Sequence, residues 1–314
     1  GHGGSFRGMA GRRLGYEPGH IRRVRNADVM TTEDTPARSC TGNSIGLNDG
    51  VSDLSEFDAA TAVAADGSAL IVDGWDINGN ANGGYLMAMA GRAMRDASGR
   101  PHPITVTGHY LAPGKPGPVQ IDSTVVKAGR RFATVSAQMH TGGKPMMQLV
   151  GAFGDLADAT SFEHAGSVPP DLPPFDQCVQ RDRAQGSADV GLSDRIDVRL
   201  NPAHMGWLTG ERTGDAEIAG WFAFRDGRPI DTLALLMICD AFPPAVFNLD
   251  MPPGWVPTVE YTVHVRAVPA PGPLMCVFRT HFVSSGFLNE DGEVWDSTGR
   301  LVAQSRQLGL TPLA

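Results

Sequence analysis

The sequence predicts an α+β protein built from two similar units, in each of which an antiparallel sheet wraps one long central helix. Three observations predict this fold. Segments in the second half of the chain repeat segments of the first half at an offset of about 150 residues. Each half contains one helical segment that is apolar almost all round, which indicates a buried helix. The segments after it alternate apolar and polar residues, as the strands of a half-buried sheet do.

The repeat runs in the same order through both halves. "DGW" at Asp73–Trp75 is echoed by "AGW" at Ala219–Trp221, and each is followed by a turn and an apolar helical segment. After the helix, Val106–Val126 matches Val263–Val283, and both segments turn on a Pro-Gly pair. Near the end of each half, "TGGKPMMQLVGAFG" matches "TGRLVAQSRQLGL". One buried helix wrapped by a curved antiparallel sheet is the hot dog architecture, so the sequence predicts a double hot dog.

The composition of the chain changes along its length and predicts the domain boundaries. Residues 51–155 and 190–314 carry the two repeats. Between them, 156–189 is rich in proline, glycine and polar residues, which is typical of a linker. Residues 1–50 lack periodicity and are predicted to be a disordered or cloning-derived tail, with Met30 as a candidate native first residue.

The bulk properties of the 314 residues exclude several classes of function. The formal net charge of −8 argues against nucleic acid as a partner, because phosphate binding needs a basic face. No apolar run approaches the roughly 20 residues that span a bilayer, and no secretory signal is recognisable. The cysteines form no CxxC pair, which indicates reduced thiols in a cytoplasmic protein. They are Cys40, Cys178, Cys239 and Cys276.

Two apparent motifs fail in their context. "GNSIG" at Gly42–Gly46 matches the serine hydrolase pattern, but no apolar strand precedes it, so Ser44 is predicted to be a loop serine. The nine histidines include no HxxxH or HExxH pair, and only His102 and His109 lie close together, in a strand-like stretch. We therefore expect neither a metal nor a cofactor.

A glycine-dense stretch, "DINGNANGGYLMAMAGRAM" at Asp76–Met94, lies between a predicted strand and the first helix. A helix start of this kind presents free N–H groups to an anion. The glycines do not fit GxGxxG, and no Gly-Lys-Ser/Thr follows, so a nucleotide phosphate is a weak hypothesis. Gly83 and Gly84 remain candidates for binding another negatively charged group.

Several motifs occur in an order that is specific as a set. They are "NGGYL", "HYLAPG" and "AGRRFATVSAQM" in the first repeat, and "LLMICD", "VPTVEYTVHVR" and "FLNEDGEVWDSTGRLVAQSRQLG" in the second. On these motifs, the chain from about Phe57 to Leu310 resembles the double hot dog acyl-CoA thioesterases of the thioesterase II type. The resemblance implies hydrolysis of acyl-CoA by an Asp, a Thr and a Gln around one water. Carried over by motif, these are Asp240, Thr258 and Gln307.

The residues themselves agree with a site at Asp240. A carboxylate within an apolar segment is costly unless it is paired, hydrogen-bonded or functional. The first repeat has Gly91 near the corresponding place, which suggests one site per chain. In hot dog enzymes the start of the helix faces the thioester carbonyl, so the resemblance implies that the amides of Gly83 and Gly84 stabilise the oxyanion. We expect the first helix to face Asp240 across the seam between the repeats.

Other parts of the predicted site are less specific. Arg130 and Arg131 in "AGRRF" are candidates for the phosphates of CoA, although arginines at a turn are more often solvated. The loop "FPPAVFNLDMPPGW" has no counterpart in the resemblance.

The resemblance therefore implies acyl-CoA as substrate and its hydrolysis to a carboxylic acid and CoA. We favour Asp240 as general base over Asp240 as nucleophile. A hot dog enoyl-CoA hydratase would need an Asp–His pair at a helix entry, and neither "NGNANGG" nor "DGRPIDT" contains histidine. A non-catalytic acyl-CoA or lipid binder is the second alternative. A homo-oligomer is expected by analogy with hot dog proteins.

Overall fold

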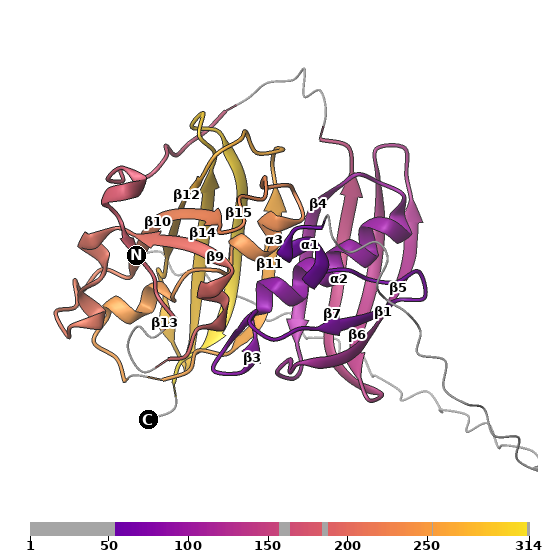
Figure 1. Ribbon diagram of the computed structural model, residues 1–314, viewed down its shortest axis with the longest axis horizontal. Helices are drawn as coiled ribbons and strands as arrows, with labels where there is room; N and C mark the ends of the chain where they lie inside the picture. The colour runs from indigo at the N-terminus through magenta and orange to yellow at the C-terminus, as the bar shows by residue number, and fades with distance from the viewer. Residues whose placement is uncertain (1–53, 157–163, 184–187, 253, 313–314) are drawn as a thin grey trace, which may run out of the picture. The chain divides into compact units, whose positions relative to one another are not determined.

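The computed structural model describes residues 54–156, 164–183, 188–252 and 254–312 (Figure 1). The predictions for residues 1–50, which include Ser44 and Cys40, lie outside the described residues. The helices are α1 (Glu56–Ala60), α2 (Gly83–Ser98) and α3 (Ala234–Ile238), with 3-10 helices η1 (Phe175–Gln177), η2 (Gly191–Asp194), η3 (Pro202–His204), η4 (Gly206–Leu208) and η5 (Ala245–Asn248). The strands are β1 (Ser68–Ile71), β2 (Asp76–Ile77), β3 (Asn80–Ala81), β4 (His102–Tyr110), β5 (Gly117–Ala128), β6 (Phe132–Thr141), β7 (Lys144–Gly154), β8 (Val179–Gln180), β9 (Ile196–Leu200), β10 (Glu217–Phe224), β11 (Thr258–Val265), β12 (Leu274–Arg279), β13 (Val283–Ser284), β14 (Phe287–Trp295) and β15 (Leu301–Leu310).

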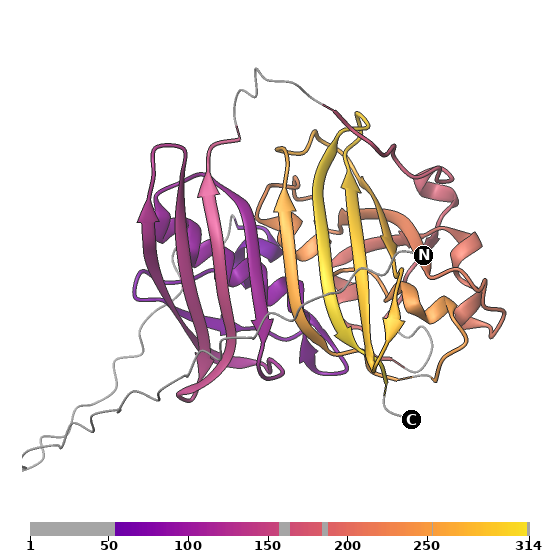
Figure 2. The same ribbon diagram turned by 180° about the vertical axis from the view of Figure 1, so that it is seen from behind.

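One large antiparallel sheet contains all of these strands except β2 and β3. The order is β1-β5-β6-β7-β4-β11-β15-β14-β12-β10-β9-β8, with β13 beside β14. Figure 2 shows these strands from the face opposite the view of Figure 1. The predicted α+β class with antiparallel strands is confirmed.

The prediction of two separate sheets is wrong, because β4 of the first half pairs with β11 of the second. Val106 lies opposite Val263 in this pair, and the hydroxyls of Thr107 and Thr262 are 2.8 Å apart. Each strand would otherwise be an edge with unpaired N–H and C=O groups, and pairing satisfies both. The two half-sheets therefore form one continuous sheet of 13 strands.

Helix α2 is the long helix predicted for the first half. The side-chain oxygen of Asn82 caps it by accepting from the N–H of Tyr85 at 2.9 Å. Gly99, with a φ of 64°, ends it in the left-handed conformation that favours glycine. The buried face of α2 packs on β4, β5, β6 and β7, and its first turns contact α3 (Figure 1).

The prediction of a long helix in the second half is wrong. Helix α3 has five residues, and Asp240 lies in the turn that follows it, where its N–H donates to the Met237 carbonyl at 2.9 Å. Pro243 and Pro244 prevent a helix from continuing past Phe242, because proline lacks an N–H donor and disfavours helical backbone in the preceding residue. The chain instead turns into η5.

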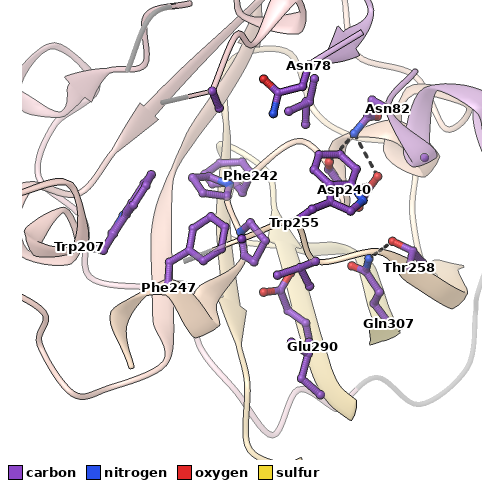
Figure 3. Close-up of a pocket in the computed structure, with 18 of the residues that line it drawn as sticks. Asn78, Asn82, Trp207, Asp240, Phe242, Phe247, Trp255, Thr258, Glu290 and Gln307 are labelled. Atoms are coloured by element: carbon purple, nitrogen blue, oxygen red, sulfur yellow. Dashed lines mark hydrogen bonds between the residues drawn. The ribbon is translucent and has the colours of Figure 1, made fainter. Parts of the chain in front are cut away.

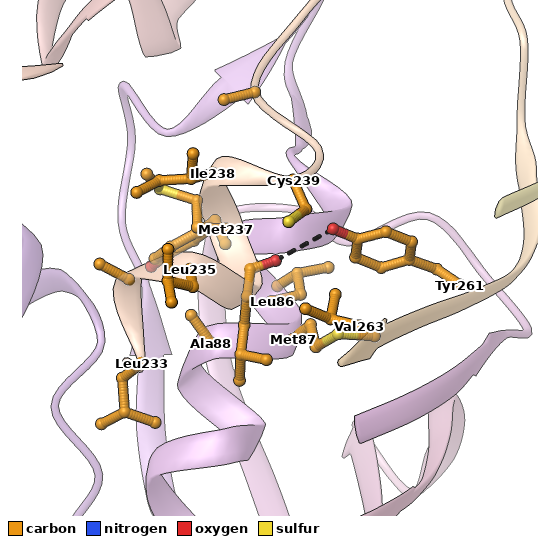
Figure 4. Close-up of a cluster of buried hydrophobic side chains, with 14 of the residues drawn as sticks. Leu86, Met87, Ala88, Leu233, Leu235, Met237, Ile238, Cys239, Tyr261 and Val263 are labelled. Carbon is orange, nitrogen blue, oxygen red and sulfur yellow. Dashed lines mark hydrogen bonds between the residues drawn. The ribbon is translucent and has the colours of Figure 1, made fainter. Parts of the chain in front are cut away.

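The two helices share one core at the centre of the structure (Figure 4). Leu86 and Met87 of α2 are buried with Leu235 and Met237 of α3, and Val263 of the joining strand β11 belongs to the same cluster. Burial of each such side chain contributes about 1.5–3 kcal/mol. Burial therefore stabilises the α2–α3 contact, which lies next to Asp240. In the described part of the chain, no helix has the length and apolar character needed to cross a bilayer.

Candidate active site

A cavity of about 400 Å³ opens beside the turn that carries Asp240. Residues from both halves of the chain line it, from the loop before α2 to strands β11, β14 and β15. One part of its wall is aromatic and the other polar (Figure 3). The aromatic residues are Trp207, Phe242, Phe247 and Trp255, and the polar ones include Asn82, Asp240, Thr258, Glu290 and Gln307. Phe242 to Trp255 belong to the loop that the resemblance left unmatched.

The start of α2 holds the Asp240 carboxylate from the other half of the chain. Oδ2 of Asp240 accepts from the Gly84 N–H at 2.8 Å and from Nδ2 of Asn82 at 3.0 Å. The same Nδ2 donates to the Asp240 carbonyl at 2.8 Å. A negative charge at a helix N-terminus is favourable, because the helix dipole and free N–H groups point at it. Asn82 thus caps the helix with its oxygen and orients the acid with its nitrogen.

Burial raises the pKa of Asp240 to about 6, and the hydrogen bonds from Gly84 and Asn82 oppose that rise. The carboxylate is therefore mostly ionised at neutral pH, and it is a stronger base than an exposed aspartate. Its second oxygen, Oδ1, accepts no hydrogen bond from any residue that the structure describes. Asp240 combines a fixed orientation with a free basic oxygen, as a general base requires.

Thr258 and Gln307 meet on the neighbouring strands β11 and β15. Nε2 of Gln307 donates a hydrogen bond to Oγ1 of Thr258. Thr258 lies opposite Gly309 in the β11–β15 ladder. Gly309 is two residues from Gln307, so Thr258 and Gln307 lie on the same face of the sheet. Both side chains line the cavity with Asp240, although within the described ranges neither hydrogen-bonds it directly. The structure therefore brings the three predicted residues to one cavity.

Glu290 is a cavity residue that the sequence did not reveal. It lies directly opposite Gln307 in the β14–β15 ladder, and its Oε2 accepts from the Ala245 N–H at 2.6 Å. Burial and the nearby charge of Asp240 raise the pKa of Glu290 to about 8, against the Ala245 hydrogen bond. Glu290 is thus mainly neutral at pH 7. Its stretch "FLNEDGEVW" is rich in acids, as solvated strands often are, so no local signal distinguishes it.

Gly83 and Gly84, both predicted to bind the oxyanion, differ in what their N–H groups contact. The Gly84 N–H binds Asp240, so it is not available to an oxyanion. A Cβ on Gly84 would lie 2.8 Å from the Met237 carbonyl oxygen, which shows that glycine permits the close approach of α2 and α3 rather than of a substrate. The Gly83 N–H has no acceptor among the described residues, and Gly83 lines the cavity.

Arg130 and Arg131 lie outside this cavity. They occupy the turn between β5 and β6, where Nη2 of Arg100 donates to the Arg130 carbonyl at 3.4 Å. Neither arginine lines the cavity with Asp240. Their contact with CoA phosphates stays a prediction. No group of three or more His, Cys, Asp and Glu side chains in the described ranges is arranged to hold a metal ion.

Replacing Gly84 with Ala should destabilise the protein by about 1–3 kcal/mol, because the new methyl group meets backbone atoms of α3 that cannot turn away. Gly91→Ala is the matched control in the same helix. There the Cβ meets only the ends of flexible side chains, Cδ1 of Leu236 at 2.6 Å and Cδ2 of Leu233 at 3.6 Å. Thermal unfolding of both variants measures the difference. Equal melting temperatures for the two variants would contradict the close α2–α3 contact.

Two domain models match separate parts of the chain. The acyl-CoA thioesterase N-terminal domain matches residues 71–154, and the acyl-CoA thioesterase C-terminal domain matches residues 169–311. A solved structure described as a candidate thioesterase II from Thermobifida fusca is 33% identical, with a TM-score of 0.75 over 83% of this chain and 99% of that one. The chain belongs to the acyl-CoA thioesterase family. The resemblance seen in the sequence motifs is thereby confirmed.

Two further relatives agree with this family and its fold. A conserved protein of unknown function with a hot dog fold from Alicyclobacillus acidocaldarius is 26% identical, with a TM-score of 0.72 over 82% of this chain and 98% of its own. An uncharacterized protein of Mycobacterium tuberculosis is 26% identical over 260 residues, which are 76% of this chain and 88% of the relative. The hot dog fold predicted from the repeats is confirmed by the first of these.

Proposed function

We propose that the protein hydrolyses acyl-CoA thioesters to a free carboxylic acid and CoA, with Asp240 activating a water that Thr258 and Gln307 hold. The observation that carries the proposal is the shared cavity. It joins a basic carboxylate with one free oxygen to a hydrogen-bonded Thr–Gln pair on two adjacent strands. Membership of the acyl-CoA thioesterase family supplies the substrate class.

The proposed reaction needs one proton carrier. Oδ1 of Asp240 takes a proton from water as the water oxygen bonds to the thioester carbon, and the carbonyl becomes a tetrahedral oxyanion. The oxyanion then collapses, the carbon–sulfur bond breaks, and the CoA thiolate receives the proton that Asp240 holds. The Gly83 N–H, at the positive end of α2, is the donor that we assign to the oxyanion.

The Thr–Gln pair has a positioning role in this scheme. Because Thr258 accepts from the Gln307 amide, its own hydroxyl hydrogen is free to point at another oxygen. A water bound between Thr258 and Oδ1 of Asp240 would be held in one orientation. Preorganised hydrogen bonds of this kind lower the cost of reaching the transition state.

Replacing Gln307 with Ala should lower kcat by about tenfold to a hundredfold, since it removes an orienting contact and leaves the base in place. Gln304→Ala is the matched control, because Gln304 lies on the same strand and its side chain contacts Arg266 outside the cavity. Steady-state thiol release measures both. If Gln304→Ala loses as much activity as Gln307→Ala, the positioning role is contradicted.

A thiol-release assay against acyl-CoA thioesters of several chain lengths tests the function itself. We expect CoA release in proportion to acid formed. Binding without release would indicate the non-catalytic alternative. Loss of the double bond of an enoyl-CoA without thiol release would indicate a hydratase. Either result would overturn the proposed hydrolysis.

A further inference from the structure

Arg181 is a buried arginine that lines the cavity, and its guanidinium has no partner among the residues that the structure describes. It follows β8, within the segment predicted to be a linker, and it is 8% exposed. Its Nε atom is buried without an acceptor. No residue that the structure describes accepts a hydrogen bond or forms an ion pair with its guanidinium. The side chain nevertheless contributes to the wall of the cavity that contains Asp240.

The other arginines in comparable positions are paired. Arg228, whose side chain is 7% exposed, binds the carboxylates of Asp58 and Asp231. Arg212, which also lines the cavity, forms an ion pair with Asp250 at 3.1 Å. Burial alone lowers the pKa of Arg181 to about 10, so it is still charged at neutral pH. A buried charge without a counterion is costly, and such a group is retained where something else supplies the anion.

We propose that Arg181 binds an anionic oxygen group of the acyl-CoA ligand, either a carboxylate at the far end of a dicarboxylic acyl chain or a phosphate of CoA. This inference rests on the proposed function for the identity of the ligand. A guanidinium presents a planar fork of N–H donors that matches a carboxylate or a phosphate in a bidentate pair. Both sources share this chemistry.

The position of Arg181 fits recognition of a part of the ligand away from the thioester. In the sheet order β8 lies at one edge, five strands from β15, which carries Gln307. One cavity nevertheless includes both residues. A ligand that places its thioester beside Asp240 and Thr258 can therefore extend along the aromatic wall and bring an anion to Arg181.

Stability of the ligand-free protein separates a binding role from a structural one. Arg181→Met removes an unpaired buried charge and keeps an unbranched apolar chain, so its melting temperature should equal or exceed that of the wild type. Arg228→Met is the structural comparison, because it removes the ion pairs to both Asp58 and Asp231, leaves Asp58 with Arg92 alone, and should lower the melting temperature. A clear loss of stability in Arg181→Met would mean that the arginine holds the fold, and the proposal would fail.

Calorimetric titration with thioether analogues, which cannot be hydrolysed, tests binding directly. The probes are S-carboxybutyl-CoA, S-pentyl-CoA and the same two thioethers of pantetheine, which lack the CoA phosphates. We compare wild type, Arg181→Met and Arg183→Gln. Arg183 is a nearby exposed arginine that is paired with Asp189 and does not line the cavity. It controls for the general charge of the segment.

In Arg181→Met, loss of the charged contact should weaken binding by about tenfold to a hundredfold. A loss confined to the two carboxybutyl probes identifies the acyl carboxylate. A loss confined to the two CoA probes identifies a phosphate. Unchanged affinity for all four probes, or an equal loss in Arg183→Gln, would overturn the proposal. Because the probes are not substrates, this result is independent of whether the wild type hydrolyses acyl-CoA.

Discussion

Replacing Asp240 with Asn should lower the turnover of acyl-CoA by about two to four orders of magnitude while acyl-CoA still binds. The amide keeps the shape of the side chain, and its oxygen can still accept from Gly84 and Asn82. It cannot take a proton from water. The loss should therefore appear in kcat, with KM changed little, and single-turnover thiol release measures it.

The stability of Asp240→Asn distinguishes lost chemistry from lost folding. The pKa of Asp240 rises from 3.8 to about 6 on folding, so the charged form is disfavoured in the folded protein. This penalty is absent below about pH 4, grows as the pH rises towards 6, and stays constant above. At pH 8 the variant should thus be more stable than the wild type, by about 1–3 kcal/mol. Asp122→Asn, at an exposed ion pair with His140, is a control that should keep full activity.

The pH dependence of kcat/KM should follow two carboxyl groups of the cavity. Below about pH 6 the base is protonated, so the rate should fall tenfold for each pH unit, reaching about a hundredfold at pH 4. Near pH 8 Glu290 ionises, and its negative charge beside the developing oxyanion and thiolate should lower the rate again. A bell-shaped profile is expected, whose two limbs belong to the interacting pair.

Variants separate the two limbs of this profile. Glu290→Gln should remove the fall above pH 8 and leave the acidic limb. Residual activity of Asp240→Asn should lack the acidic limb. Initial rates over pH 4 to pH 9 in buffers of constant ionic strength measure both. An acidic limb that persists unchanged in Asp240→Asn would assign the titration to another group.

Asp240 as a nucleophile is the main chemical alternative to Asp240 as a base. Direct attack would form an acyl anhydride on the carboxylate. The base is favoured, because Thr258 and Gln307 have a task in holding water and none in direct attack. A single turnover in ¹⁸O water separates the routes. The base route labels only the acid product, and label found on the Asp240 carboxylate would establish the anhydride.

The sequence predicted the features that repeat or that are set by local patterns. The offset between halves predicted antiparallel hot dog units, and the "NANGG" segment predicted the start of α2 at Gly83. The motif order also selected Asp240, Thr258 and Gln307, which line one cavity. Apolar periodicity could not set the length of α3, because Cys239, Ala241 and Phe242 in the following turn are apolar and buried, as the helix itself is.

Other features depend on contacts between distant segments, so no local pattern carries them. Pairing of β4 with β11 merges the two half-sheets. The sequence does not predict this pairing, because an edge strand has no local pattern that identifies its partner. The contact of the Gly84 amide with Asp240 depends on how closely α3 approaches α2, which the sequence does not show. Glu290 and Arg181 gain their importance from burial in the cavity, and their own segments have the composition of a solvated strand and a linker.

A crystal structure of the wild-type protein with S-pentyl-CoA bound, at a resolution that defines ordered water, tests the central claim most directly. The account predicts one water beside the sulfur that lies about 2.6–3.2 Å from Oδ1 of Asp240 and from Oγ1 of Thr258, with Gln307 holding the threonine. A ligand whose sulfur lies away from Asp240, or a site in which no water reaches both Asp240 and Thr258, would contradict it.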